Sequence, residues 1–407
     1  MPLIGFTKGI VVLFKTIKMK TGLFSCLFCL LAFSLSAQNF PIGQRTMNFT
    51  DPSRSNRSVP AEVYYPGLTA GTNTPLANGK FPVISFGHGF LMAYDYYLYL
   101  KDVLVPLGYI LAFAKTETGL LPSHLEFGKD LAFLVNQMKL EGNTPASVYF
   151  NHIDSTSAVM GHSMGGGASF LGCENNPVPN AMITFAAAET SPSAIAAATH
   201  IGIPSLVFSA DLDCVTPPAT NQVPMYDSLA SDCKVFINIK GGGHCYFADY
   251  NFICSVGEVG CASFTITREQ QHKTVVDFLV PYLNYYLKKN SLGWTVFNDS
   301  LHYSPRITYM ESCTTAGIPD PGRLDQFVIS PNPVHDKLTV TSGSGQDRVA
   351  RIVVRSLTGS IVLTRYEKDE TGTTSTEVDL SFCKAGAYFL EITGRNGMIM
   401  VYRLIKV

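Results

Sequence analysis

The chain of 407 residues is longer than one average domain, and its composition is that of a folded protein. Apolar residues make up 46% of it and charged residues only 15%, which supports a large core and excludes wholesale disorder. There are 30 basic and 31 acidic residues, a formal net charge of −1, so no excess of basic charge points to nucleic acid as a partner.

Residues 1–37 have the layout of a secretory signal peptide. Four lysines precede an apolar run over residues 22–33, and small residues follow as far as Ala37, where we expect cleavage. The run is shorter than the roughly 20 apolar residues that a membrane-spanning helix needs, so a retained anchor is the weaker alternative. We therefore expect a secreted or cell-surface protein without a stable membrane span.

Short apolar runs alternate with amphipathic stretches between residues 38 and 312. The predicted strands are 82–86, 109–114, 157–160, 181–185, 204–210 and 234–239. Several are apolar throughout, which is typical of strands covered on both faces. Helices are predicted at 126–140 and 269–289, and Pro281 is expected to bend or split the second. The pattern predicts an α/β domain with a mostly parallel sheet and helices on both faces.

The character of the chain changes near its end. Residues 313–325, rich in Thr, Gly, Pro and Asp, are interpreted as a linker. Residues 326–407 then show short strand-like runs separated by turn residues, which predicts a small β-sandwich. The runs lie at 337–340, 350–354, 360–364, 387–392 and 398–406.

Three motifs in this tail form a recognisable set. They are Ile-Ser-Pro-Asn-Pro at 329–333, Leu-Thr-Gly at 357–359 and Lys-Ala-Gly-Ala-Tyr-Phe-Leu at 384–390. With them the tail resembles the C-terminal sorting domain of proteins exported by the type IX secretion system of Bacteroidetes. The resemblance implies that this machinery is a partner and that it exports the chain across the outer membrane. A carbohydrate-binding or adhesive sandwich is the alternative.

The most informative motif of the chain is Gly-His-Ser-Met-Gly at residues 161–165. It follows a predicted strand and precedes a helix-compatible stretch, which is the context of a nucleophile elbow. The glycines allow the tight turn, and the turn presents the Ser163 hydroxyl at a helix N-terminus. The motif predicts Ser163 as the nucleophile of a hydrolase.

A serine nucleophile needs a base, and the base needs an orienting acid. In this fold class the chain order is Ser, Asp or Glu, His. His244 follows a predicted strand on a glycine-rich loop and is therefore the expected base. Asp211 and Asp213 both follow the strand at 204–210; Asp213 lies further into the loop and is favoured as the acid, with Asp211 capping the loop.

Acyl transfer also requires donors for the oxyanion. The first expected donor is the backbone N–H of Met164, the residue after the nucleophile. The second is the backbone N–H of Phe90 in the loop Phe-Gly-His-Gly-Phe at 86–90. His88 is interpreted as a brace of this loop rather than as a catalytic group.

These motifs, together with Ala-Asp-Leu-Asp-Cys-Val-Thr-Pro at 210–217, resemble those of the cutinase-like polyester hydrolases of the α/β-hydrolase superfamily, which include poly(ethylene terephthalate) hydrolases. The resemblance covers most of residues 80–290. It implies Ser163, Asp213 and His244 as the catalytic triad, with Phe90 and Met164 as oxyanion donors. Those enzymes carry a tryptophan beside the cleft where this chain reads Phe-Ala-Ala-Ala-Glu at 185–189. The missing aromatic clamp argues against aromatic polyester as the natural substrate.

Only 16 residues, 188–203, separate two predicted strands where lidded lipases insert a helical cap. The cleft is therefore expected to be open, which suits bulky or polymeric esters. Four nearby tyrosines could border the cleft, although their helical spacing favours a core position. They are Tyr94, Tyr96, Tyr97 and Tyr99.

The chain has 10 cysteines, of which Cys26 and Cys29 lie in the signal peptide. In an exported protein the other eight cysteines favour disulfides over a metal site. No Cys-x-x-Cys motif with a matching pair of histidines accompanies them, as a zinc site would require. A bridge from Cys214 to Cys245 would join the loops of the acid and the base. Pairings Cys214–Cys233 and Cys254–Cys261 are equally open, because connectivity does not follow from sequence.

The sequence thus predicts a secreted serine hydrolase of carboxylic esters that needs no metal or organic cofactor. Its expected partners are an ester substrate, possibly polymeric, and the type IX machinery. A lipase or a phenolic-ester (feruloyl-type) esterase is the alternative activity, and a non-catalytic surface-binding protein is the remote one.

Overall fold

The computed structural model describes residues 39–313, 327–342, 348–356, 360–367, 375–395 and 399–407. The expected signal peptide and nearly all of the expected linker lie outside these residues. Among the helices of the described part, none combines the length and the apolar character needed to cross a bilayer.

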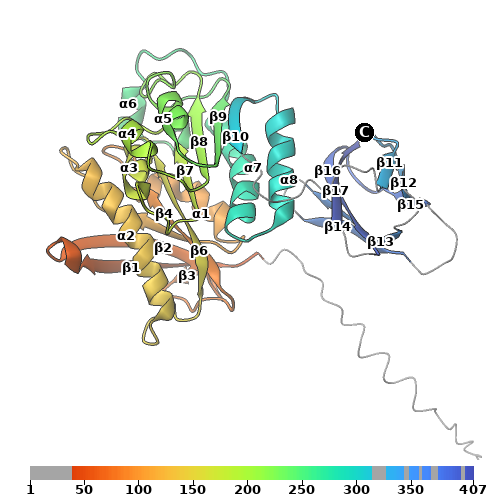
Figure 1. Cartoon of the computed structure of the whole chain (residues 1–407), viewed down its shortest axis with the longest axis horizontal. Helices are drawn as coiled ribbons and strands as arrows, with labels where there is room; N and C mark the ends of the chain where they lie inside the picture. The colour runs from red at the N-terminus through yellow and green to blue at the C-terminus, as the bar shows by residue number, and fades with distance from the viewer. Residues whose placement is uncertain (1–38, 314–326, 343–347, 357–359, 368–374, 396–398) are drawn as a thin grey trace, which may run out of the picture. The chain divides into compact units, whose positions relative to one another are not determined.

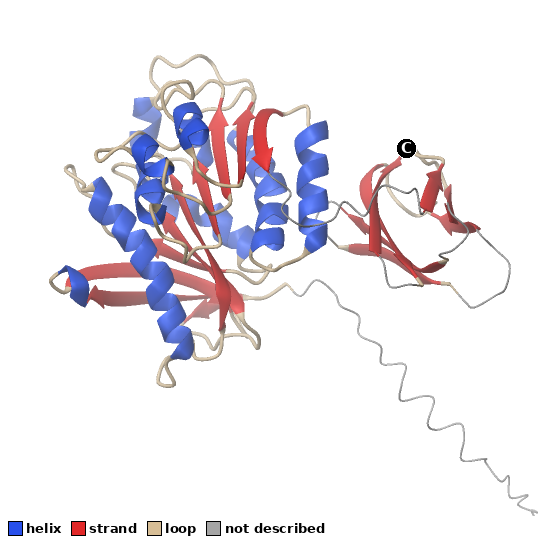
Figure 2. Cartoon of the chain, viewed as in Figure 1, coloured by secondary structure: helices blue, strands red, loops and turns tan. Residues whose placement is uncertain are grey.

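A ten-stranded sheet forms the centre of the larger domain (Figures 1 and 2). Its strands, in spatial order, are β10(Ile307–Cys313), β9(Cys233–Ile239), β8(Ser205–Ala210), β7(Ala181–Phe185), β6(Ile153–His162), β4(Phe81–Gly87), β5(Ile110–Ala114), β2(Arg57–Pro66), β1(Ile42–Asp51) and β3(Gly71–Thr72). The six strands from β9 to β5 are parallel. Strand β10 pairs antiparallel with β9, β2 with β5 and β1 with β2, whereas β3 pairs parallel with β1. The predicted α/β class with a mostly parallel sheet is confirmed.

Helices cover both faces of this sheet, as Figure 2 shows. The helices are α1(Leu98–Leu104), α2(His124–Asn143), α3(Met164–Cys173), α4(Ala194–Ala198), α5(Gln222–Ser228), α6(Phe252–Gly257), α7(Arg268–Tyr286) and α8(Ser291–Tyr303). Alternate residues of β4 serve the two faces: Val83 packs in the core that contains α2 and α3, and Ile84 in the core that contains α1, α7 and α8. Both side chains are fully buried, which explains why the strands are apolar throughout.

Two details differ from the sequence-based expectation. Helix α7 runs through Pro281 as one helix, so the predicted split is wrong; the proline is buried within it. The domain also extends one residue beyond its expected end, because Cys313 closes β10 and pairs in register with Cys233 of β9. A disulfide joins these two cysteines and fixes the edge strand to the sheet.

The C-terminal part is a separate β-sandwich. One sheet contains β11(Phe327–Ser330), β12(Lys337–Ser342) and β15(Ser375–Asp379), and the other contains β14(Ile361–Tyr366), β13(Val349–Ser356), β16(Gly386–Gly394) and β17(Ile399–Lys406). Alternate residues of the two sheets, such as Leu338 and Ile352, fill its own apolar core.

Candidate active site

Ser163 lies in the sharp turn between β6 and α3, with φ +55° and ψ −117°. This is a strained backbone conformation for a residue other than glycine, and strain of this kind is held in place by close packing around it. A Cβ on Gly161 would lie 2.2 Å from the carbonyl oxygen of Gly165, and a Cβ on Gly165 would lie 2.2 Å from that of Gly87. The two glycines of the motif are therefore required for strand, turn and helix to pack this closely.

The three predicted triad residues meet at the carboxyl edge of the parallel strands. His244 Nε2 lies 2.9 Å from Ser163 Oγ, and His244 Nδ1 lies 2.8 Å from Asp213 Oδ2. The side chains come from loops after β6, β8 and β9, which lie within four consecutive strands of the sheet, with β7 between β6 and β8. All three are buried, and Ser163, at 8%, is the most exposed of them. The arrangement can move the serine proton to the imidazole while the carboxylate faces the developing charge.

Asp213 is held by three donors besides the imidazole. Its Oδ1 accepts the backbone N–H groups of Val215 and Thr216 at 2.9 and 2.8 Å, and its Oδ2 accepts the Thr216 hydroxyl at 2.8 Å. The same hydroxyl lies 3.0 Å from His244 Nδ1. Our sequence interpretation missed Thr216, because its contact with both partners depends on how the loop folds back on itself.

Asp211, the other candidate acid, points to a different partner. Its Oδ1 accepts the backbone N–H of Gly241 at 2.6 Å, at the start of the loop that carries His244. The carboxylate therefore ties the loops after β8 and β9 together, close to the capping role expected from the sequence.

The two expected oxyanion donors lie at neighbouring strand ends. Met164 is the first residue of α3, so its N–H has no acceptor within the helix. Phe90 is the second residue of a turn in which the N–H of Met92 donates to the carbonyl of Gly89 at 3.1 Å, and Leu91 there has φ +53°. An N–H at the second position of such a turn points away from the turn's own hydrogen bond.

His88 braces this loop, as expected. Its ring is fully buried, with Nδ1 2.9 Å from the carbonyl of Gly89 and Nε2 2.8 Å from the carbonyl of Thr116. Burial lowers the pKa of His88, and the two carbonyl oxygens that face its ring nitrogens oppose this shift. The ring connects the loops after β4 and β5 and lies outside the proton-transfer chemistry.

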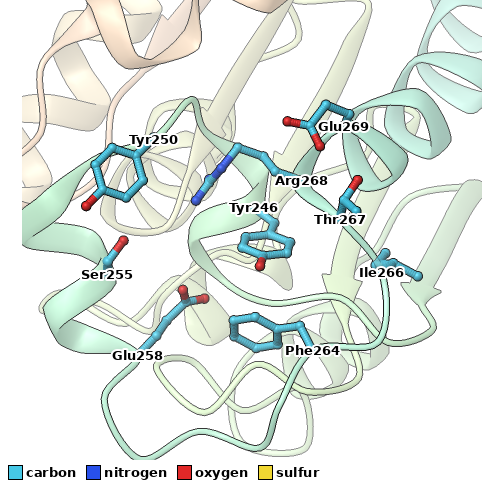
Figure 3. Close-up of a pocket in the computed structure, with 9 residues that line it drawn as sticks. All are labelled: Tyr246, Tyr250, Ser255, Glu258, Phe264, Ile266, Thr267, Arg268 and Glu269. Carbon is cyan, nitrogen blue, oxygen red and sulfur yellow. The ribbon is translucent and has the colours of Figure 1, made fainter.

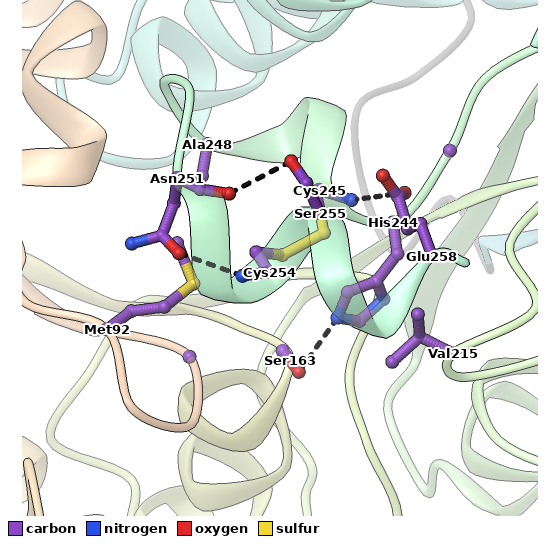
Figure 4. Close-up of a disulfide and its surroundings, with 12 residues drawn as sticks. Met92, Ser163, Val215, His244, Cys245, Ala248, Asn251, Cys254, Ser255 and Glu258 are labelled. Atoms are coloured by element: carbon purple, nitrogen blue, oxygen red, sulfur yellow. Dashed lines mark hydrogen bonds between the residues drawn. A yellow bond between two sulfur atoms is a disulfide. The ribbon is translucent and has the colours of Figure 1, made fainter.

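Two disulfides secure the segment between His244 and α7. One joins Cys245 to Cys254 (Figure 4), and the other joins Cys214 to Cys261. The expected bridge from Cys214 to Cys245 is therefore wrong, as are the two alternative pairings. Each catalytic loop is instead joined to the intervening segment, in which Asn251 caps α6 and closes the short loop to Cys254.

A cavity of about 600 Å³ lies beside the base loop rather than at Ser163 (Figure 3). Its lining residues are Tyr246, Tyr250, Ser255, Glu258, Phe264, Ile266, Thr267, Arg268 and Glu269. Arg268 donates to the carbonyls of Cys245 and Ala248, and its guanidinium lies 4.6 Å from the ring centre of Tyr246. These contacts fix the backbone that follows His244.

The sheet order and the nucleophile elbow define an α/β-hydrolase. The comparison with protein families narrows this class: residues 36–265 match the family described as PET hydrolase-like, and residues 328–406 match the secretion system C-terminal sorting domain. The first match covers more than half of the chain, and the protein belongs to the PET hydrolase-like family. The second confirms the expected sorting tail, and with it export.

Three curated relatives show where the similarity is concentrated. Cutinase 1 of Thermobifida cellulosilytica and a cutinase of Thermobifida fusca (strain YX) are each 34% identical over 104 residues, which is 25% of this chain and 38% and 33% of those proteins. Cutinase est1 of Thermobifida alba is 32% identical over 96 residues, 23% of this chain and 31% of that protein. The matched stretch thus spans about a third of these relatives.

Proposed function

We propose that the protein is an exported serine hydrolase that cleaves carboxylic esters, with Ser163 as nucleophile, His244 as base and Asp213 as the orienting acid. The observation that carries the proposal is the continuous contact from Ser163 Oγ through the His244 ring to Asp213 Oδ2, at 2.9 and 2.8 Å. Membership of the PET hydrolase-like family supports the same chemistry.

The reaction proceeds in two halves. His244 takes the proton of Ser163 as its oxygen attacks the acyl carbon, and the tetrahedral oxyanion is stabilised by the backbone N–H groups of Phe90 and Met164. The proton then passes from His244 to the leaving alcohol and an acyl-enzyme remains. Water, activated by the same imidazole, attacks this ester and releases the acid, returning the proton to Ser163.

Exposed apolar side chains around the carboxyl edge of the sheet support a bulky or polymeric substrate. They lie in loops after β4, β5, β8 and β9, the strand ends that surround Ser163. The residues are Phe90, Leu120, Leu121, Val215, Tyr250, Phe252, Ile253, Val256 and Val259, between 38% and 97% exposed. A set of exposed apolar groups of this size indicates an interaction surface.

The part of this apolar rim at residues 250–267 carries little charge. Between residues 250 and 267 the only charged residue is Glu258, and its carboxylate turns inward to the backbone N–H of Cys245 at 2.8 Å. An uncharged apolar surface suits an uncharged substrate such as a polyester. The segment at 185–189, in the region where the cutinase-like enzymes have their cleft tryptophan, offers no aromatic ring to the cleft, because its Phe185 is fully buried; an aliphatic polyester therefore suits this site better than an aromatic one.

The test is an ester panel on the purified chain, with Ser163→Ala as control. We expect wild type to react with a fluorophosphonate probe and to hydrolyse short soluble esters and an aliphatic polyester film faster than a feruloyl ester or a long-chain triglyceride. Ser163→Ala should lose both labelling and hydrolysis. Absence of labelling in folded wild-type protein would contradict a serine mechanism, and preference for the triglyceride or the feruloyl ester would contradict the polymeric substrate.

A further inference from the structure

A chain of buried hydrogen bonds joins the loop of the proposed oxyanion donor to the loop of the proposed base. The backbone N–H of Gly89 donates to the Tyr97 hydroxyl at 2.9 Å, the hydroxyl lies 2.9 Å from His162 Nδ1, and His162 Nε2 lies 3.1 Å from the carbonyl oxygen of His244. Tyr97 and His162 are both 0% exposed. The His162 ring also packs against the His244 ring, with ring centres 4.7 Å apart.

Which group donates in each of these hydrogen bonds follows from the two backbone groups at the ends of the series. The carbonyl of His244 can only accept, so His162 Nε2 carries the hydrogen and Nδ1 of the neutral ring must accept. The Tyr97 hydroxyl then donates to Nδ1 and uses its lone pair for the Gly89 N–H. The thioether of Met92, 3.3 Å from the same hydroxyl, is the weaker acceptor of the two.

The titration behaviour of the two side chains agrees with this arrangement. Burial lowers the pKa of His162 well below its ordinary value, and the neighbouring His244 lowers it further. Burial also raises the pKa of Tyr97. Both side chains are therefore uncharged near neutral pH. The donor and the acceptor of each of these hydrogen bonds thus stay the same there.

Tyr97 belongs to a short helical segment that is attached to the base loop at further points. The backbone N–H of Asp249 donates to the carbonyl of Tyr96 at 2.7 Å, and its carboxylate accepts the N–H of Leu98 at 3.1 Å. The hydroxyl of Tyr99 donates to the carbonyl of Phe247 at 3.1 Å. Three of the four tyrosines that could have bordered the cleft, Tyr96, Tyr97 and Tyr99, thus connect loops of the site.

We propose that Tyr97 and His162 are positioning residues that hold the Phe90 N–H and the His244 imidazole in a fixed mutual arrangement. The proposal rests on the proposed function and adds to it. Gly89 immediately precedes Phe90, and a Cβ on Gly89 would lie 3.2 Å from the Tyr97 hydroxyl and 3.3 Å from His162 Nδ1. A displacement of either side chain therefore shifts the peptide that carries the oxyanion donor, and through the His244 carbonyl it shifts the base.

The matched experiment compares two tyrosine-to-phenylalanine substitutions. Tyr97→Phe removes one hydroxyl from the chain and keeps the ring. Tyr149→Phe removes a hydroxyl that is equally buried and has no hydrogen-bond partner in the part of the chain that the structure describes. We expect Tyr97→Phe to lower kcat on a soluble ester about tenfold or more with little change in KM, because loss of an oxyanion donor costs about a hundred- to a thousandfold and displacement costs less. Tyr149→Phe should keep wild-type kcat.

Two further readouts separate positioning from a purely structural role. Affinity for a boronic acid, which forms a tetrahedral adduct on the serine, should fall in parallel with kcat in Tyr97→Phe. His162→Gln retains a donor for the His244 carbonyl but breaks the link to Tyr97, so Tyr97→Phe and His162→Gln should be strongly non-additive in kcat. His162→Gln carries the test alone if Tyr97→Phe does not fold.

The outcomes separate this proposal from the proposed function. A folded Tyr97→Phe or His162→Gln protein with wild-type kcat and boronate affinity, or full additivity of the two changes, would overturn the positioning role and leave the triad intact. If folded wild-type protein neither reacts with a fluorophosphonate nor binds the boronate, both proposals fall together.

Discussion

The carboxylate of Glu258 accepts a hydrogen bond of 2.8 Å from the backbone N–H of Cys245, the residue that follows His244. Figure 4 shows this contact beside the bond between His244 and Ser163. A Cβ on Gly243 would lie 2.8 Å from the same carboxylate, so Glu258 packs against the base loop on both sides of His244. The segment that the two disulfides secure thus reaches back to support the proposed base.

Glu258 should make stability fall as pH rises. Burial is the largest influence on its carboxyl group and raises the pKa above the ordinary 4.5. The folded protein therefore binds the proton more tightly than the unfolded chain, and its advantage is lost as pH rises from about 4.5 through the raised value. Glu258→Gln, which keeps an acceptor for the Cys245 N–H, should gain stability relative to wild type as pH rises above the ordinary pKa of 4.5 in thermal melts.

Glu258→Ala is the control for this prediction. It removes the acceptor as well as the charge, so we expect lower kcat than in Glu258→Gln at every pH. A constant difference in melting temperature between wild type and Glu258→Gln across the pH range would show that the carboxyl group does not titrate in this window.

The two aspartates after β8 should differ sharply in their effect on activity. Asp213→Asn should lower kcat on a soluble ester about ten-thousandfold, because the amide cannot hold the imidazole in the productive tautomer. Asp211→Asn keeps an oxygen for the Gly241 N–H and should leave kcat within about threefold of wild type. Steady-state kinetics with both variants check this, and a comparable loss in Asp211→Asn would contradict the assignment.

Thr216→Val should reduce activity without unfolding the protein. The change preserves shape and removes the hydroxyl that donates to Asp213. Gln222, which also contacts this hydroxyl, retains the carbonyl of Ala187 at 2.6 Å as an acceptor. We expect kcat to fall about tenfold, the equivalent of one buried hydrogen bond. Thr216→Ser is the matched control, and its kcat should be close to wild type.

Removal of two of the disulfides should have different effects, one mainly on stability and the other mainly on activity. On the loop-entropy model the bond Cys233–Cys313, which closes 80 residues, contributes about 4.5 kcal/mol, and Cys245–Cys254, which closes 9, contributes about 2.6 kcal/mol. Replacing the first pair by serine should lower the melting temperature more. Replacing the second should lower kcat more, because it frees the backbone after His244. The reverse order in kcat would contradict a role for the short bridge in the site.

The apolar rim should determine adsorption rather than chemistry. Phe252→Ser combined with Ile253→Ser should reduce binding of the inactive Ser163→Ala protein to a polyester film, with soluble-ester kinetics unchanged in the active background. Val148→Ser with Phe150→Ser is the matched control, because these exposed residues precede β6 at the opposite edge of the sheet. Equal loss of adsorption in the two double variants would indicate non-specific hydrophobic adsorption and contradict a specific docking surface.

Much of the fold could be predicted because its central strands are apolar runs followed by glycine or acidic residues. The runs at 204–210 and 234–239 correspond to β8 and β9, and their loops were identified from the aspartates, glycines and histidine that follow. Strands β1 and β2 were missed. In the second half of β1 the exposed polar residues Thr46, Asn48 and Thr50 alternate with less exposed ones, so no continuous apolar run marks it.

The remainder depended on three-dimensional packing. Eight cysteines allow 105 complete pairings. Cys214 and Cys245 pair with Cys261 and Cys254 because of the path that the segment after His244 takes through space. Thr216 and Tyr97 carry no local signal for their contacts. Each becomes informative only when loops more than 25 residues apart in sequence are brought together, as the bonds Thr216–His244 and Tyr97–His162 show.

The bond between Cys233 and Cys313 has a bearing on maturation. It lies at the junction with the sorting tail, at the last residue of the edge strand. A protease that removes the tail anywhere beyond Cys313 leaves β10 covalently tethered to its neighbour. The released domain then keeps its edge strand β10 attached at the new carboxyl terminus. Removal of the tail therefore does not start unfolding of the sheet from that edge.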